Sequence, residues 1–432
     1  MSNLGPAIRF ASSLYRERAG IAFAGYAQRD PVSLLSLRPG RSSPYPIYDR
    51  LRATGTLVPT RLGNWSTTSH RVCDSVLRDR RFGVRPPEEN GPGEELFDLS
   101  FLGMNPPDHT RLRRLAQPAF SPSAIAGYTS RIESKVGELL DQAGAAGEFD
   151  LISAFAVALP IAVITDMLGI PDANAQEFSR FGTVIASALD GVRSLRHAAQ
   201  LKESDAALGQ LFKGLFELRR REPQDDVVSR IVTAQGSQIQ PAEMLPMCTL
   251  LLVAGFETTV NLIGNGVLAL LSHPEQWAAL CADPEGLASR AVEETLRWDP
   301  PVQATSRIAQ EALELEGKPV RKGQVVLTLL GATGRDPEVF ERPDTFDIHR
   351  EQTAGNLAFS SGIHYCLGKP LALLEANVAL RVLAERMPDL ALAGKVRRRN
   401  ATVIRGPVSV PVTVGSRRRA ATGATSVAPV GG

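Results

Sequence analysis

One long apolar segment, residues 245–271, constrains the fold of this chain more than any other feature. Pro241 suits the first turn of a helix, and a His-Pro pair follows Ser272, so the sequence predicts a helix over 241–272. At 1.5 Å per residue this helix would be about 47 Å long, enough to cross a whole domain. Residues 250–256 are apolar nearly all round, which is typical of a helix buried on every side.

Three polar residues argue against a membrane-spanning role for this helix. Glu257, Asn261 and Asn265 would have to enter lipid without polar partners, which is costly. The 432 residues carry 48 Lys and Arg against 46 Asp and Glu, so no strong field favours nucleic acid or an anionic membrane. We therefore expect a cytoplasmic protein that acts on small molecules, with no nucleic acid and no membrane as partner.

Helical periodicity also dominates the middle of the chain. Apolar positions recur at helical spacing from about residue 121 to 231. The predicted breaks in this region are 144–147, Pro160, 169–171 and Pro223. Further helices are predicted over 287–298 and 369–386, and a strand is predicted over 325–330.

The two ends of the chain differ from its middle. An apolar run at 21–27 is interpreted as a core segment, and PPEENGPG at 86–93 predicts a loop. Residues 415–432 are poor in bulky apolar side chains, which predicts a disordered tail. No repeat or linker divides the remainder, so residues 1–414 are expected to form a single domain, mainly α within the α+β class.

The segment FSSGIHYCLG, residues 359–368, carries the clearest chemical signal. The four cysteines lie far apart without a CxxC pair, so neither a disulfide framework nor a zinc site is indicated. Cys366 stands just before a predicted helix, where free amide groups stabilise the thiolate, the form that binds iron. Gly362 and Gly368 leave room for a flat macrocycle, and Phe359 can shield the sulfur from water. A buried structural cysteine is the alternative.

This segment resembles the haem-ligand signature of the cytochrome P450 superfamily, F-x-x-G-x-[HR]-x-C-x-G. Every fixed position matches, at Phe359, Gly362, His364, Cys366 and Gly368. Glu294 and Arg297 match the family's E-x-x-R pair, which holds the loop beside the haem. Residues 254–259, AGFETT, match its oxygen-activation motif A-G-x-[DE]-T-[TS]. The resemblance covers at least residues 45–412.

A group of cationic and donor side chains would hold the haem propionates. His109 and Arg113 are four residues apart on a predicted helix, so both can reach the same carboxylate. The resemblance adds Arg307 and His364 to this group. It implies haem b with Cys366 as the iron ligand. It also implies the cytochrome P450 fold, a triangular helical domain with a long central helix and a smaller β-rich region.

The activity that the resemblance implies is that of a haem-thiolate monooxygenase. Such an enzyme uses O2 and two electrons from NAD(P)H to hydroxylate or epoxidise a bulky apolar molecule, here in bacterial secondary metabolism. Glu257 and Thr258 would deliver protons, with a carboxylate that turns between solvent and site. Gly255 would permit a local kink that widens the helix at this point.

The partners and the substrate pocket are expected as follows. The electrons would come through ferredoxin reductase and a ferredoxin that docks over Cys366, near Arg111, Arg114 and Lys369; the chain itself would be a monomer. The pocket would draw on 86–100, 179–188 and 402–404. The residues expected to contact substrate are small or aliphatic for the most part, namely Leu250, Val253, Ala254, Val302, Gln303, Thr305 and Val403.

Two other functions and three departures from the family pattern are part of this prediction. A haem-binding module without turnover, such as a sensor or an assembly-line docking module, and a peroxide-driven peroxygenase are the alternatives; an intact Glu257 and Thr258 argues against both. Ser360 stands where glycine is usual and could alter the turn under the haem. Asn105 stands where aspartate is common, and Asn356 where histidine is frequent.

Overall fold

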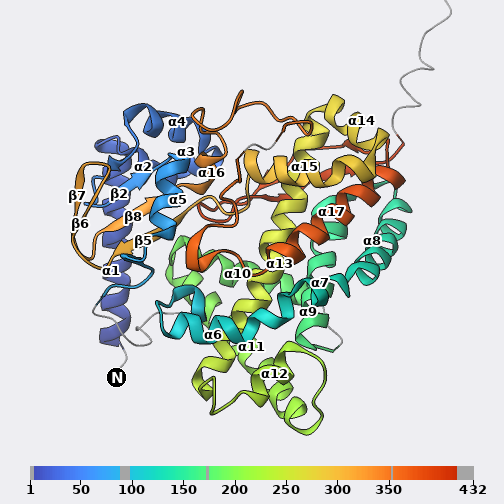
Figure 1. Cartoon of the computed structure of the whole chain (residues 1–432), viewed down its shortest axis with the longest axis horizontal. Helices are drawn as coiled ribbons and strands as arrows, with labels where there is room; N and C mark the ends of the chain where they lie inside the picture. The colour runs from blue at the N-terminus through green and yellow to red at the C-terminus, as the bar shows by residue number, and fades with distance from the viewer. Residues whose placement is uncertain (1–3, 88–97, 172–174, 352–353, 416–432) are drawn as a thin grey trace, which may run out of the picture.

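Helices form most of the molecule, and a smaller β region lies at one side (Figure 1). The computed structural model describes residues 4–87, 98–171, 175–351 and 354–415. In Figure 1 the long helix α13 (Pro241–Ser272) runs through the middle, between the β region and the helices near the C-terminus. This arrangement confirms the predicted mainly α fold with a long central helix and a smaller β-rich region.

The remaining α-helices are short to medium in length, apart from α11. Before α13 they are α1 (Leu4–Ala22), α2 (Pro31–Leu35), α3 (Arg38–Ser42), α4 (Tyr45–Thr54), α5 (His70–Arg78), α6 (Asp108–Ala116), α7 (Pro122–Ala126), α8 (Thr129–Gly144), α9 (Ala158–Leu168), α10 (Ala175–Ala186), α11 (Leu195–Arg221) and α12 (Val227–Thr233). After it they are α14 (Pro274–Ala282), α15 (Pro284–Trp298), α16 (Leu330–Thr333) and α17 (Lys369–Arg386).

Within the described residues the strands form one mixed sheet and three small ones. The five-stranded sheet has the order β1 (Val58–Pro59), β2 (Trp65–Thr67), β8 (Val325–Thr328), β5 (Thr305–Ala309) and β3 (Phe82–Gly83). The three-stranded sheet has the order β4 (Glu148–Asp150), β12 (Pro411–Thr413) and β9 (Ala391–Leu392). Two hairpins pair β6 (Leu313–Leu315) with β7 (Lys318–Val320), and β10 (Arg397–Arg398) with β11 (Pro407–Ser409).

Helix α13 begins and ends where the sequence predicts. Its N-terminus has a capping box, in which the Glu243 carboxylate accepts a 2.8 Å hydrogen bond from the Gln240 amide. By length and composition alone α13 could cross a membrane, but 83% of its most hydrophobic window is buried inside the molecule. Burial against protein on most sides explains why its sequence is apolar nearly all round.

Two glycines let neighbouring helices approach α13 closely. A Cβ atom on Gly182 of α10 would lie 2.0 Å from the Phe256 ring, and one on Gly255 would lie 2.6 Å from Ile164 of α9. Gly255 therefore serves helix packing. Residues 241–272 form one uninterrupted α-helix, and the local kink at Gly255 stays a prediction.

The predicted helical region 121–231 is confirmed with two corrections. Strand β4 interrupts it, and Pro160 lies inside the first turn of α9 where a break was expected. Proline is tolerated there because the first amide groups of a helix have no acceptor within the helix. The other breaks are confirmed: α8 ends at Gly144, Gly169 caps α9 with φ +75°, and α11 ends at Arg221.

Three predictions at other places need correction or lie outside the described residues. The strand predicted over 325–330 ends at Thr328, because Leu330 begins α16. The run 21–27 is only partly a core segment, since Phe23 and Tyr26 are 61% and 59% exposed. Most of the predicted loop at 86–93, and all but the first residue of the predicted tail, lie outside the described residues.

Candidate active site

The loop before α17 holds Cys366 at the start of that helix. The Cys366 amide donates a 2.9 Å hydrogen bond to the Phe359 carbonyl, which folds the loop back on itself. Burial raises the pKa of the Cys366 thiol, whereas the amides of Gly368 and Lys369 and the charge of Arg113 lower it. The first amides of α17 therefore point at the sulfur, as predicted for a site that stabilises a thiolate.

The turn that precedes Cys366 depends on two left-handed residues. Gly362 has φ +68°, and a Cβ atom there would lie 2.2 Å from the Leu77 carbonyl oxygen. The glycine is thus required by the close passage of α5, a reason that differs from the predicted room for a macrocycle. Gly368 does leave room, because the nearest atom to an added Cβ, on Phe120, is 3.7 Å away. Ser360 has φ +63°.

Four cationic or donor side chains meet on one side of this loop. The rings of His109, on α6, and His364 lie 4.3 Å apart between centroids. Burial and the nearby Arg113 and Arg307 lower the pKa of His109 to about 4. Burial, Arg307, His109 and Arg113 likewise lower the pKa of His364 to about 3, and burial lowers that of Arg307 to about 10. The four predicted propionate-binding residues are therefore close neighbours.

This group has no internal counter-charge among the described residues. No carboxylate contributes to the pKa shifts of His109, His364 or Arg307. Both ring nitrogens of His109 and Nε2 of His364 are buried without a hydrogen-bond partner in the described structure. Buried donors and cations of this kind require an anionic partner, and a ligand with two carboxylates, such as haem, fits them.

The middle of α13 presents an accessible face in an otherwise buried helix. Ala254 is exposed and Thr258 is half-buried, whereas Leu250 and Val253 are buried. The Thr258 hydroxyl donates a 3.2 Å hydrogen bond to the carbonyl of Ala254, one turn earlier. An exposed alanine in the centre of the molecule indicates open space beside it.

Glu257 is buried, with 3% exposure, and its carboxylate is held from two directions. Oε1 forms an ion pair with Arg399, and Oε2 accepts a 3.4 Å hydrogen bond from the Thr183 hydroxyl on α10. Burial raises the pKa of Glu257, and Arg399 and Thr183 oppose this rise. In this arrangement the carboxylate is turned toward Arg399 and away from solvent, and its predicted turning between solvent and site stays a prediction. The sequence does not predict Arg399 as the partner of Glu257, because three consecutive arginines stand at 397–399 and nothing distinguishes one of them.

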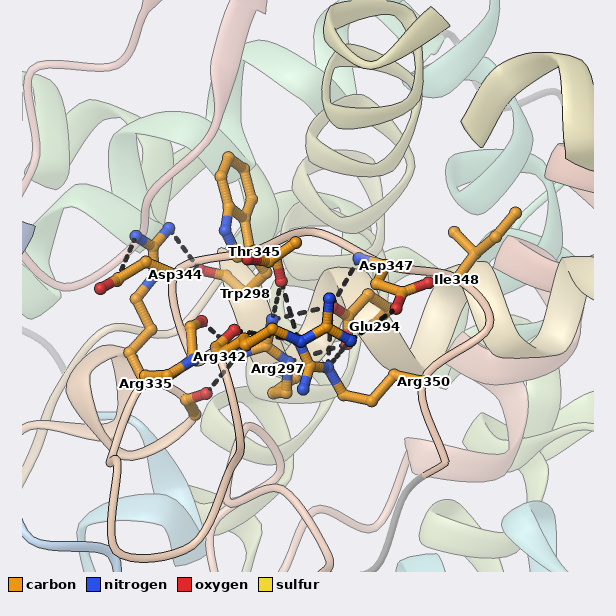
Figure 2. Close-up of polar contacts among 12 residues, drawn as sticks. Glu294, Arg297, Trp298, Arg335, Arg342, Asp344, Thr345, Asp347, Ile348 and Arg350 are labelled. Atoms are coloured by element: carbon orange, nitrogen blue, oxygen red, sulfur yellow. Dashed lines mark hydrogen bonds and ion pairs between the residues drawn. The ribbon is translucent and has the colours of Figure 1, made fainter. Parts of the chain in front are cut away.

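Glu294 and Arg297 on α15 form the predicted ion pair, with two hydrogen bonds of 2.7 and 2.8 Å (Figure 2). Both side chains are fully buried, at 1% and 0% exposure. The Arg297 guanidinium also donates to the carbonyls of Gly334, Pro343 and Thr345 at 2.6 to 2.8 Å. The pair therefore ties α15 to the loop over 334–350.

Arg350 extends this network and was not predicted. Its guanidinium lies 3.3 Å from Glu294 and donates a 2.9 Å hydrogen bond to the Thr345 carbonyl (Figure 2). The Asp347 amide donates a further 2.9 Å hydrogen bond to Glu294. No local spacing relates Arg350 to Glu294 in the sequence, so only the folded loop brings them together.

The residues predicted to contact substrate differ in the backbone and side-chain contacts that they already make. Val302 pairs with Ile404 in an isolated bridge, and the Thr305 hydroxyl lies 3.3 Å from Arg307. The Val403 amide donates a 2.7 Å hydrogen bond to Asp190. Gln303 needs correction, since its buried amide accepts from the Tyr48 hydroxyl at 3.1 Å and donates to the Pro300 carbonyl at 2.7 Å. This side chain is occupied in holding α4.

The basic residues predicted over Cys366 are only partly available. Arg111 pairs with Glu243 at 2.6 Å and Asp108 at 2.8 Å, so its charge is neutralised, contrary to the prediction. Arg114 is exposed. The Lys369 ammonium lies 5.5 Å from the ring centroid of Phe359 and 5.7 Å from that of Tyr365.

Comparison with known proteins places this site in a family. The family model described as Cytochrome P450 matches residues 287–386. Cytochrome P450 107B1 of Saccharopolyspora erythraea is 41% identical over 368 residues, which are 83% of this chain and 86% of the relative. The biotin biosynthesis cytochrome P450 of Bacillus subtilis is 37% identical over 360 residues, 81% of this chain and 91% of the relative.

Solved structures agree in fold as well as in sequence. P450BioI, in complex with an acyl carrier protein ligated to hexadec-9Z-enoic acid, matches with a TM-score of 0.81 at 37% identity, over 87% of this chain and 98% of that one. CYP164A2 of Mycobacterium smegmatis, without ligand, matches with a TM-score of 0.81 at 38% identity, over 89% and 99%. The chain therefore belongs to the cytochrome P450 family of haem-thiolate monooxygenases.

Proposed function

We propose that this cytochrome P450 monooxygenase uses Cys366 as its haem ligand and oxidises a bulky apolar molecule at a C–H or C=C bond. The observation that carries the proposal is the pairing of two features. One is a half-buried thiol at the first amides of α17, and the other is a group of four cationic or donor side chains that lacks a counter-charge in the described structure. Haem bound by a thiolate supplies the redox chemistry that activates dioxygen.

The residues assigned to the cofactor follow from this geometry. His109, Arg113, Arg307 and His364 would bind its two carboxylates. Gly368 leaves space beside the sulfur, and Phe359, packed against the main core, limits the access of water to it. Glu294 and Arg297 keep the adjoining loop in place without touching the cofactor.

Thr258 and Glu257 are proposed to control the protons. The Thr258 hydroxyl lies on the accessible face of α13 and can both accept and donate a hydrogen bond there. The Glu257 carboxyl is next to it in sequence and is the nearest acid on that helix, because the segment around it is apolar. Its proton would reach the site only after the carboxylate leaves Arg399.

The substrate is proposed to be a bulky apolar molecule of bacterial secondary metabolism. Leu250, Val253, Ala254, Val302 and Val403 would supply an apolar surface beside α13. Relatives of this chain include 6-deoxyerythronolide B hydroxylase, at 36% identity, and solved structures with myristic acid and with testosterone. All three names describe largely apolar molecules, which supports this class of substrate.

The family implies redox partners, and we propose a ferredoxin, reduced by NAD(P)H through ferredoxin reductase. Beside Leu367, the residue after the thiol, lies a surface hollow of about 450 Å³ that Arg114 and Phe120 help to line. Together with Lys369 this gives an exposed, positively charged surface near the sulfur. Residues 1–414 are proposed to act as one catalytic domain, monomeric and cytoplasmic. In support of a single domain, the main hydrophobic core extends from Phe101 to Val412, and smaller cores pack residues 35–82 against residues 304–332.

The ligand assignment is tested on the reduced carbon monoxide complex. The wild type should show the red-shifted Soret band of a thiolate ligand, and Cys366→His should lose it while the control Cys281→Ala keeps it. A histidine-like band in the wild type, or a red-shifted band in Cys366→His, would refute Cys366 as ligand.

The reaction class is tested by what turnover requires. A substrate is first found by titration of the haem spin state, beginning with myristic acid and testosterone. Product that forms only with O2, NAD(P)H and the redox partners supports the proposal. Product with peroxide alone indicates a peroxygenase, and binding without any product indicates a non-turnover module.

A further inference from the structure

The C-terminal hairpin, residues 397–409, lies directly on the central helix. Its strands β10 and β11 pair in antiparallel fashion, and the Arg399 amide donates a 2.9 Å hydrogen bond to the Gly406 carbonyl. A Cβ atom on Gly406 would lie 1.9 Å from Oδ1 of Asn261, so the base of the hairpin touches α13 one turn from Glu257. This contact is what brings Arg399 to the Glu257 carboxylate.

The tip of the same hairpin binds the loop between α10 and α11, residues 187–194. Oδ1 of Asp190 accepts hydrogen bonds of 2.7 Å from the amides of both Thr402 and Val403. The Arg193 guanidinium donates a 2.9 Å hydrogen bond to the Asn400 carbonyl. One short hairpin is therefore fastened to the central helix at its base and to the α10–α11 loop at its tip.

Glu257 is in contact with the hairpin and with the helix that precedes this loop. Arg399 reaches it from the hairpin, and Thr183 reaches it from α10, the helix that leads into the α10–α11 loop. Among the described residues the charged group that faces the carboxylate is Arg399; Thr183 is neutral, and the Asn261 amide bonds to the Glu257 backbone carbonyl at 2.6 Å. The hairpin and α10 therefore both contact the Glu257 carboxyl, and they are also joined to each other through the α10–α11 loop.

We propose that Arg399 is a positioning residue, which keeps the Glu257 carboxylate turned toward the hairpin for as long as the α10–α11 loop is fastened to the hairpin tip. The inference rests on the proposed role of Glu257 as an acid for the reaction. A carboxylate paired with an arginine cannot give up a proton, so proton delivery requires the pair to part. Val403, proposed to contact substrate, belongs to the tip, so a bound ligand acts on the same element.

A purely structural role for this ion pair is the alternative. The side chains of Arg399 and Glu257 are only 13% and 5% exposed, and a buried pair contributes little net stability over apolar residues of the same size. Either role predicts that loss of Arg399 raises the pKa of Glu257, because the ion pair stabilises the carboxylate. Only a positioning role predicts that release of the hairpin tip, with both members of the pair intact, changes the titration of Glu257 as well.

The first experiment follows the Glu257 carboxyl by infrared spectroscopy of the haem-loaded protein across a pH series. The band of its protonated form is assigned by its loss in Glu257→Gln. Arg399→Met should raise the midpoint of this titration by about one to three pH units, and Arg399→Lys should restore it. The control Arg397→Met removes an equal charge from the same hairpin at an exposed side chain and should leave the midpoint unchanged. An unchanged midpoint in Arg399→Met would overturn the positioning role.

The second experiment tests the link to the loop without altering either member of the ion pair. Asp190→Ala should speed amide hydrogen exchange in peptides that cover 187–194 and 399–403, and should also raise the Glu257 midpoint. The control Arg196→Ala, at an exposed side chain just beyond the loop, should do neither. Faster exchange with an unchanged Glu257 midpoint would overturn the coupling. Neither measurement needs turnover, so a failure here differs from a failure of the proposed reaction.

Discussion

At the scale of single residues, opposing effects act on each group that carries chemistry. Burial destabilises the charged form of Cys366, and the first amides of α17 with Arg113 restore part of that stability. Burial acts in the same direction on Glu257, where Arg399 opposes it. The neighbours of each residue therefore decide whether it is charged, and three predictions belong to this scale.

The first concerns Ser360, which holds a left-handed conformation, φ +63°, beside Gly362. This conformation costs a non-glycine residue about 1 to 2 kcal/mol, so Ser360→Gly should raise the free energy of unfolding by about 1 kcal/mol. Denaturant unfolding measures the difference. Ser361→Gly is the matched control, because Ser361 is extended and glycine there should lower stability. A destabilising Ser360→Gly would show that its side chain matters more than its backbone.

The second concerns the proton relay. Loss of general acid catalysis costs about a hundredfold to ten-thousandfold in rate, so Glu257→Gln should slow product formation by a factor in that range. Thr258→Ala should keep consuming NAD(P)H and release peroxide in place of product. The measured quantity is product formed per NAD(P)H oxidised, and both variants should bind substrate as the wild type does. A Thr258→Ala enzyme as tightly coupled as wild type would contradict the assignment.

The third concerns Glu375, a fully buried carboxyl on α17 that the sequence reasoning missed. Burial raises its pKa well above that of an ordinary glutamate, and Oε2 has no hydrogen-bond partner among the described residues. Above the unfolded-state pKa, about 4.3, the unfolded chain loses this proton while the folded protein keeps it, so stability falls as the pH rises. Glu375→Gln should therefore stabilise the protein more at pH 7 than at pH 4 in urea unfolding. An equal effect of Glu375→Gln at both pH values would contradict this.

At the scale of elements, a small number of buried polar contacts joins segments that have no regular structure of their own. The loop over 334–350 is held by Arg297 through three of its carbonyl groups (Figure 2). The hairpin over 397–409 is held by Asp190 at its tip and by α13 at its base. Loops of this kind keep their position only while the side chain at the junction stays paired.

This gives a prediction for the Glu294–Arg297 pair. Glu294→Gln leaves the buried Arg297 with carbonyl partners alone, and Arg297→Met leaves Glu294 with the more distant Arg350, so each should cost about 3 to 5 kcal/mol, Arg297→Met at the lower end. The double variant should cost less than the sum of the two. Glu385→Gln, which breaks the exposed pair with Arg381, should cost less than about 1 kcal/mol. The free energy of unfolding is measured in denaturant for each variant. If either single variant loses as little stability as the control, the structural role of the pair is contradicted.

At the scale of the whole molecule, the proposed cofactor site and the proposed electron-donor surface draw on different residues around the cysteine loop. The cationic group and the accessible face of α13 define the side where cofactor and substrate are proposed. Arg114, Lys369 and the hollow beside Leu367 define the side where an electron donor can approach. Because these residues differ, we expect a protein electron donor to bind without competing with the substrate.

The prediction at this scale concerns partner docking. If charge steers an acidic ferredoxin to Arg114, the rate of reduction should fall as salt rises from low to physiological concentration. Arg114→Glu should lower the low-salt rate by at least tenfold and weaken its dependence on salt. Arg111→Gln should have a smaller effect, because Glu243 and Asp108 already neutralise Arg111. A rate that ignores both salt and the charge at Arg114 would contradict docking on this surface.

The sequence by itself determined the features that depend on neighbouring residues. The bounds of α13 and α17, the cysteine at the start of a helix and the Glu294–Arg297 pair all follow from periodicity, capping and spacing within one element. These interactions join residues a few positions apart, so the local helix geometry sets them and the packing of distant segments does not. They were enough to indicate the family and its chemistry.

Only the tertiary structure decided which distant residues meet. It paired Glu257 with Arg399, occupied Gln303 with Tyr48, neutralised Arg111 and made Gly362 necessary for the passage of α5. A sequence pattern shows that a buried carboxylate needs a partner, but many arginines could supply it. The choice among them depends on how helices and loops pack, because a contact between distant segments forms only when the backbone brings both to the same place.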